Sequence, residues 1–169
     1  TRVDQNIAAG IARGIAETRS STVVVGWDGG RASAGTEIFG SVLDQLLERT
    51  RAAVEVARLE QPLNVTRRLV VVLPPATDRH PGFYEAARIC KVLAGRLGAS
   101  LNAMVVADDT ARFEAMLGPI RPSLNTTFER VGGWGDVLGR LREKIQPDDL
   151  VVVVSTRRGT VSWHPKLER

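Results

Sequence analysis

Short valine-rich runs, separated by helical patterns, are the feature that most constrains how this chain can fold. Five such runs predict strands, and a sixth, weaker run predicts another: residues 22–26, 53–59, 69–73, 100–106 and 150–154, with 126–131 as the weaker one. Most of these runs are apolar on both alternating faces, which is typical of parallel strands covered by helices on two sides.

Apolar residues at helical spacing lie between the runs and predict amphipathic helices. The predicted stripes are Ile7, Ile11 and Ile15; Val42, Leu43, Leu46 and Leu47; Phe83, Ala87, Cys90, Ala94 and Leu97; and Val137, Leu141 and Ile145. Because strand and helix patterns alternate, the predicted class is α/β, with a mostly parallel sheet and helices on both faces.

The chain also repeats itself over a long period. A helix, a turn, a valine-rich strand and a polar loop at residues 7–30 recur at 137–159, about 129 residues later. A period of this length indicates a duplicated domain. We expect residues 1–60 to be the C-terminal half of a first unit, 61–68 a linker, and 69–169 most of a second unit that is truncated at its end, so that the chain is a piece of a tandem pair.

Charge and composition narrow the classes of partner. The net charge of +4 is spread along the chain and aromatic residues make up 5% of it, so we expect no nucleic-acid partner. Cys90 is the single cysteine, which excludes an internal disulfide. No apolar run approaches the roughly 18 residues that span a bilayer, so we expect a soluble chain that does not itself insert into a membrane.

A glycine-rich segment follows the first predicted strand and leads to a helix. Its candidate ligand-binding residues are Gly26, Asp28, Gly29, Gly30, Gly40 and Ser41. Backbone amides of such a loop, with a helix N-terminus behind them, can hold a phosphate. The spacing matches neither the dinucleotide fingerprint nor the P-loop. Three other roles stay open: turn glycines, a helix cap at Ser41 and a turn residue at Asp28.

In its order of strand, Gly26, Gly29, Gly40 and Ser41, this segment resembles the C-terminal half of a universal stress protein domain, a fold like that of the adenine nucleotide alpha hydrolases. In that family the loop holds the phosphates and ribose of ATP, so the resemblance implies ATP or another adenine nucleotide as ligand. The spacer between Gly29 and Gly40 is one residue longer than the family pattern. In the second copy Ser155 stands where the first glycine would be.

A narrower resemblance covers nearly the whole chain. Residues 4–8, 38–44, 61–64 and 155–162 are similar to the C-terminal region of bacterial monovalent cation/proton antiporters, of the sodium/proton or Kef type. This resemblance implies a regulatory domain at the cytoplasmic face of the inner membrane, joined to the antiporter membrane domain of the same polypeptide. Stress-protein domains associate through their last strand, so it also implies a homodimer paired through residues 53–59. The alternatives are a free-standing tandem stress protein that binds ATP, and an enzyme of the adenine-nucleotide hydrolase type.

Catalytic and metal-binding patterns are not recognisable in the sequence. His80 and His164 have no cysteine or carboxylate at zinc-ligand spacing. The acidic pairs at 108–109 and 148–149 adjoin predicted strands, where such pairs commonly form turns or cap helices. Cys90 lies on an apolar stripe, which indicates an inert core thiol. No Ser-His-Asp or Cys-His set is apparent, so we expect neither a metal nor enzymatic activity.

Overall fold

The structure is a computed structural model that describes residues 6–27, 41–157 and 160 of the 169-residue chain. The chain divides into two compact units, of which the first extends to Glu60 and the second begins at Gln61. No helix in the described ranges is long and apolar enough to cross a membrane.

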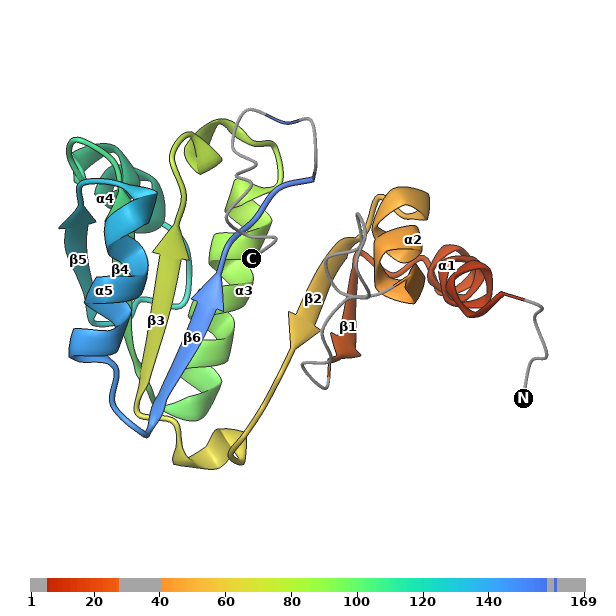
Figure 1. Ribbon diagram of the computed structural model, residues 1–169, viewed down its shortest axis with the longest axis horizontal. Coiled ribbons are helices and arrows are strands. Elements are labelled where there is room, and N and C mark those ends of the chain that lie inside the picture. Colours follow the sequence, from red (N-terminus) through yellow and green to blue (C-terminus); the bar gives the residue numbers. More distant parts are fainter. Residues whose placement is uncertain (1–5, 28–40, 158–159, 161–169) are drawn as a thin grey trace. The chain divides into compact units, whose positions relative to one another are not determined.

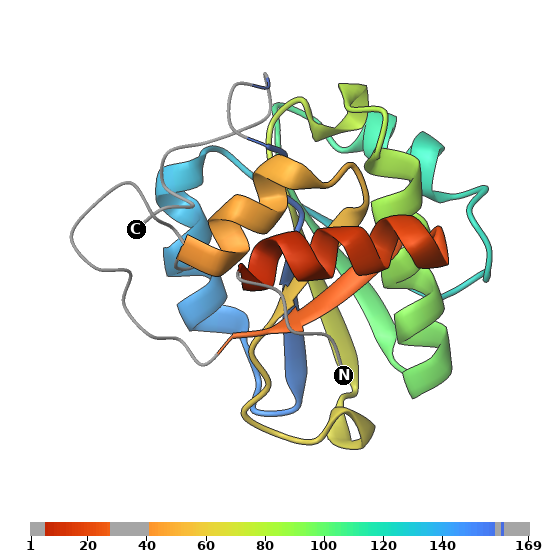
Figure 2. The ribbon, with the colours of Figure 1, turned by 90° about the vertical axis from the view of Figure 1, so that its right-hand side faces the viewer.

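The first unit is a two-stranded parallel sheet with two helices. Its elements, in chain order, are α1 (Ile7–Thr18), β1 (Thr22–Gly26), α2 (Ser41–Arg49) and β2 (Ala53–Ala57). Strands β1 and β2 pair in parallel, with Val24 opposite Glu55. Helices α1 and α2 contact each other and cover the same face of this sheet (Figures 1 and 2). Among the described residues of this unit, Ala8, Leu43 and Leu46 are apolar and buried.

The second unit is a four-stranded sheet with helices on both faces. Its elements are a 3-10 turn η1 (Leu63–Val65), β3 (Arg68–Leu73), a 3-10 turn η2 (Thr77–Arg79), α3 (Phe83–Leu97), β4 (Ser100–Val106), α4 (Ala111–Leu117), β5 (Thr126–Val131), α5 (Trp134–Lys144) and β6 (Asp149–Val153). The strand order is β5-β4-β3-β6, and every neighbouring pair is parallel. Figure 1 shows α3 on one side of the sheet and α5 on the other.

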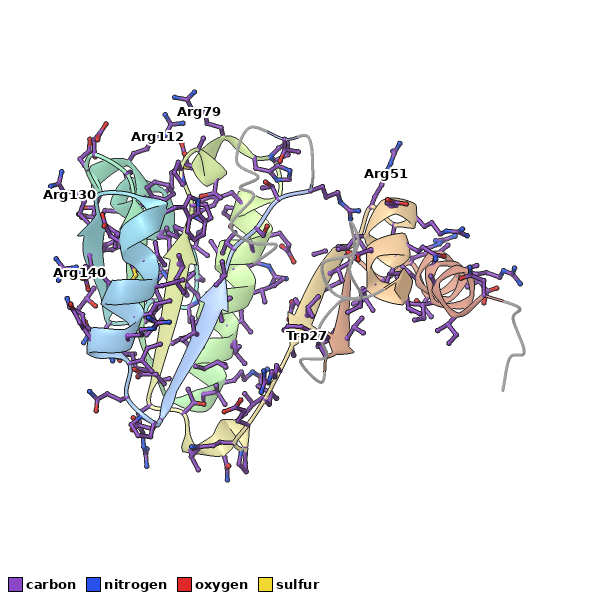
Figure 3. The ribbon with its side chains drawn as sticks, viewed as in Figure 1. Trp27, Arg51, Arg79, Arg112, Arg130 and Arg140 are labelled. Atoms are coloured by element: carbon purple, nitrogen blue, oxygen red, sulfur yellow. The ribbon has the colours of Figure 1, made fainter. Side chains whose placement is uncertain are left out.

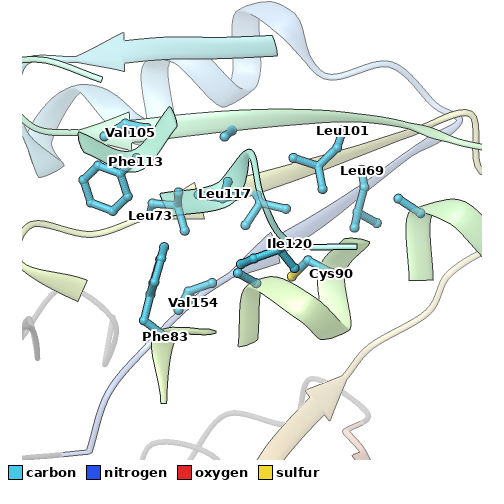
Figure 4. Packing of buried hydrophobic residues seen from close by; sticks show 14 residues of the cluster. Leu69, Leu73, Phe83, Cys90, Leu101, Val105, Phe113, Leu117, Ile120 and Val154 are labelled. Carbon is cyan, nitrogen blue, oxygen red and sulfur yellow. The ribbon is translucent and has the colours of Figure 1, made fainter. Parts of the chain in front are cut away.

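Two clusters of apolar side chains, one on each face of this sheet, hold the second unit together. On one face Leu69, Val71 and Leu73 of β3 pack with α3 and α4 (Figure 4). On the other face Val70 and Val72 pack with α5. A central strand buried on both faces needs apolar residues at every position, which explains the unbroken run of β3.

The predicted class is confirmed: the chain is α/β, and its strands are parallel. The six valine-rich runs all form strands, with end points that differ by up to two residues. Cys90 is buried, as predicted. The universal stress protein identity, the tandem repeat and the domain boundaries stay predictions.

The sequence interpretation was wrong in three details. Helix α4 was not predicted, although Phe113 and Leu117 are buried at helical spacing. Ile7 was placed on an apolar stripe, but it is 65% exposed, and the neighbouring Ala8 is buried instead. Ile145 was placed on a helical stripe but follows the end of α5, where its N–H donates to the carbonyl of Leu141.

Candidate functional site

The predicted phosphate loop begins where β1 ends and finishes where α2 begins. Gly26 is the last residue of β1 and is exposed, and the Trp27 N–H donates to the Ala57 carbonyl at 2.8 Å, which extends the pairing with β2 by one residue. Ser41 is the first residue of α2. Since β1 and β2 are parallel, the connection between them starts at the carboxyl edge of the sheet.

The other four predicted loop residues, Asp28, Gly29, Gly30 and Gly40, lie outside the described residues. Among the residues that the structure describes, an added Cβ at Gly26 would meet no atom within 4 Å. Asp44 lies in the first turn of α2. An anion bound at this helix N-terminus must therefore outweigh one negative charge nearby.

The carboxyl edge of the second sheet has its own switch point. From β3 the chain runs outward to β4 and β5, and then returns to the other side of β3 as β6. Open parallel sheets bind ligands at such a point, here between the ends of β3 and β6. Pro74 follows β3 and is buried, and the Thr77 hydroxyl donates to its carbonyl at 2.7 Å. The hydroxyl of Thr77 is therefore engaged within the loop itself.

Asp78 lies in η2, the turn that follows β3. Its carboxylate forms an ion pair with the Arg112 guanidinium, with 2.5 Å between Oδ2 and Nε. The Asp78 side chain is only 6% exposed. Figure 3 shows Arg79 and Arg112 projecting at this edge. The carboxylate at the end of β3 thus already has a cationic partner within the protein.

The amino edge of the second sheet holds a cavity of about 210 Å³ under α5. Three charged residues line it, Arg68, Glu129 and Lys144, and each of them is part of an ion pair. Arg68 pairs with Asp149, and the Lys144 ammonium lies 2.6 Å from a carboxylate oxygen of Glu129. The remaining wall includes Asn102, whose amide donates to the Thr127 hydroxyl. The charges around this cavity balance one another, so the pairs act chiefly to join the helix and strand ends.

In each acidic pair that the sequence assigned to turns and caps, the second residue has such a role. The Asp109 carboxylate accepts a hydrogen bond from the Ala111 N–H at the start of α4. The Asp149 carboxylate accepts one from the Gln146 N–H. The second partner of Asp149, Arg68, was missed because the two residues are 81 positions apart, and nothing in the local pattern relates them.

The chain matches no protein-family model and no curated protein.

Proposed function

We propose that this chain is a regulatory region of a bacterial monovalent cation/proton antiporter, on the cytoplasmic side of the membrane, and that its first unit binds an adenine nucleotide or another anionic ligand beside residues 26–41. The observation that supports ligand binding most directly is the position of this segment. It leaves the exposed carboxyl end of β1 at Gly26 and leads into α2 at Ser41.

Such a connection favours an anion for a physical reason. The first N–H groups of a helix have no partner within it, and the helix dipole adds about half a positive charge at that end. The glycines after Gly26 allow a ligand to approach the backbone closely. In the second unit, Ser155 stands after β6 at the position that corresponds to Gly26, so the proposal assigns the ligand to the first unit.

Regulation requires that the ligand distinguish between two states of the protein. A bound nucleotide can shift the antiporter only by the difference in its affinity for the active and inactive arrangements. The chain contains two compact units, and in this proposal the ligand acts on the first of them.

Nucleotide binding can be measured by titration calorimetry of the 169-residue chain with ATP, ADP and AMP at millimolar concentration. We expect binding that weakens in a Ser41→Ala variant and persists in Ser155→Ala, the equivalent change in the second unit. An absence of heat and of any thermal shift with all three nucleotides would refute the nucleotide part of the proposal.

The transport part needs a separate measurement. The reading frame upstream of Thr1 should encode a series of apolar membrane spans. In inverted membrane vesicles, the antiporter without residues 1–169 should exchange cations and protons but lose its response to nucleotide. A short upstream segment without apolar spans would instead favour the free-standing stress protein.

A further inference from the structure

A hollow of about 360 Å³ lies in the first unit, at the end of α1 and α2. Its lining includes Ser20, before β1, and Ala52, before β2. It therefore lies at the amino edge of the sheet, opposite the edge where Gly26 ends β1. Three arginines line it: Arg19, Arg49 and Arg51. Figure 3 shows Arg51 projecting from the turn between α2 and β2.

Hydrogen bonds of the backbone hold the turns that carry these arginines. Arg19 ends α1, and its N–H donates to the Ala16 carbonyl. Arg49 and Arg51 flank Thr50, which is 8% exposed and whose N–H donates to the Leu46 carbonyl at 3.1 Å. The Thr50 hydroxyl accepts a hydrogen bond from the Ala52 N–H. The guanidinium groups thus project from ordered backbone.

The conformation of Arg19 is unusual for its residue type. Its φ is 51°, in the left-handed region where glycine is the common residue at the end of a helix. A side chain with a Cβ costs about 1 kcal/mol or more in this conformation. An arginine here therefore adds a positive charge to the hollow at some cost in stability, which suggests a use for the charge.

The charges of this hollow are not balanced. Within the described part of the chain, none of the three arginines has an ion pair, whereas Arg68 and Arg112 each contact a carboxylate. None of the residues that line the hollow is acidic. The C-terminal ends of the two helices contribute about half a negative charge each. Three guanidinium charges exceed this sum by about two, so the hollow attracts anions.

We propose that this hollow binds a phosphate group, carried by free inorganic phosphate or by a lipid headgroup. A guanidinium matches phosphate oxygens through paired N–H donors, and several such forks favour a doubly charged anion over a single carboxylate. Ser20 and Thr50 also line the hollow. Their hydroxyl groups already contact the Thr18 hydroxyl and the Ala52 N–H, respectively, so the arginines supply the main contacts to the phosphate. The volume falls within the ordinary range of small-ligand sites, about 300–1,000 Å³.

This site does not depend on the nucleotide site proposed above, because the two lie at opposite edges of the sheet. A Ser41→Ala variant should leave phosphate binding unchanged. If the wild type binds phosphate but no nucleotide, the nucleotide proposal fails and the phosphate proposal stands. If it binds nucleotide but neither phosphate probe, the reverse holds.

The test compares two double variants of the 169-residue chain that remove equal charge. Arg49→Gln/Arg51→Gln alters the hollow. Arg96→Gln/Arg142→Gln removes two exposed arginines from the last turns of α3 and α5. The probes are inorganic phosphate, in calorimetry, and phosphatidylcholine vesicles with and without phosphatidic acid, in co-sedimentation.

We expect the wild type to bind at least one probe, and the Arg49/Arg51 variant to bind it at least about tenfold more weakly. The Arg96/Arg142 control should bind as the wild type does. Binding of phosphate itself identifies a soluble ligand, and binding only to vesicles with phosphatidic acid identifies a lipid headgroup. Equal loss in both variants, or no binding of either probe by the wild type, would overturn the proposal. Circular dichroism confirms that each variant is folded.

Discussion

Arg68 and Asp149 form a two-pronged ion pair between the first residues of neighbouring strands β3 and β6. The Arg68 Nε atom lies 2.9 Å from Asp149 Oδ1, and Nη2 lies 2.5 Å from Oδ2. The Asp149 side chain is 1% exposed, whereas that of Arg68 is 34% exposed. Arg68 also donates to the Lys144 carbonyl. One side chain therefore joins both strands to the end of α5.

This pair predicts a loss of stability in acid. Burial opposes the ionisation of Asp149, but hydrogen bonds from Arg68 and the Gln146 N–H outweigh it and lower its pKa. A carboxylate with a lowered pKa stabilises the folded state fully above its unfolded pKa of about 3.9, and this contribution disappears as the pH falls through the folded pKa. Asp149→Asn should cost about 2 kcal/mol of unfolding free energy near neutral pH, and the difference from wild type should shrink below about pH 4.

Denaturant unfolding at several pH values measures this effect, and Glu85→Gln is the matched control. Glu85 makes the same two-pronged contact with Arg88, but both side chains are exposed on the surface of α3. Solvent screens such a pair, so this change should matter far less. An equal cost for both variants would contradict the role assigned to burial.

Lys91 predicts a pH dependence of the same sign in alkali, where stability rises with pH because the folded state lowers the pKa of this group as well. Its ammonium is buried and donates to the carbonyls of Leu117, at 3.0 Å, and Ile120, at 2.6 Å. Burial, and secondarily the charge of Arg121, lower its pKa. The unfolded chain then holds this proton more tightly than the folded one, so folding is favoured increasingly as pH rises toward the ordinary lysine pKa of about 10.4.

A Lys91→Met variant lacks the titrating ammonium, so comparison with it isolates the effect of the Lys91 pKa on the pH dependence of stability. The unfolding free energy of the wild type minus that of the variant should increase as the pH rises toward the ordinary lysine pKa of about 10.4. Urea unfolding across this range provides the measurement. A difference that is flat or falls with pH would show that the folded state does not lower the lysine pKa.

Phe113 tests the helix that sequence patterns did not predict. On α4 its ring contacts that of Phe83 edge-on, with the ring centres 5.8 Å apart and an angle of 72° between the planes. Phe113 is 3% exposed. Phe113→Ala should lower the unfolding free energy by about 3–5 kcal/mol because it leaves a cavity in the core. Leu138→Ala, at a site 63% exposed, should change it by no more than about 0.5 kcal/mol.

Two glycines of the second unit predict changes of opposite sign. Gly98 ends α3 with a φ of 65°, so Gly98→Ala should destabilise the protein by about 1 kcal/mol. Gly139 lies within α5, and an added Cβ there meets no atom within 4 Å. Gly139→Ala should stabilise by about 0.5–1 kcal/mol, since alanine loses less backbone freedom in a helix. Thermal unfolding of both variants checks the signs.

Local patterns predicted most elements of the fold because burial repeats along the chain. The strand at residues 100–106 could be predicted because 103–106 are consecutively apolar, which is typical of a strand covered on both faces. Helix α3 could be predicted because the apolar residues from Phe83 to Leu97 recur at helical spacing. The seven-residue helix α4 escaped because it is too short to repeat its apolar spacing more than once.

Of the two candidate binding sites in the first unit, one could be predicted from the sequence and the other could not. The glycine-rich connection after Gly26 could be found from sequence because its residues are consecutive. The hollow of the first unit could not, because Arg19 and Arg51 are brought together only by the parallel pairing of the strands that follow them.

The sequence by itself determined the α/β class, the parallel strands, and the place of the predicted loop between Gly26 and Ser41. Tertiary structure decided which charged groups meet: Asp149 with Arg68, Asp78 with Arg112, and the Lys91 ammonium with backbone carbonyls. The spacing of apolar residues within a single helix or strand indicates which face of that element is buried, so this information is local. Contacts between charged residues that are far apart in the sequence depend on strand order and register, which are set only when the whole sheet forms.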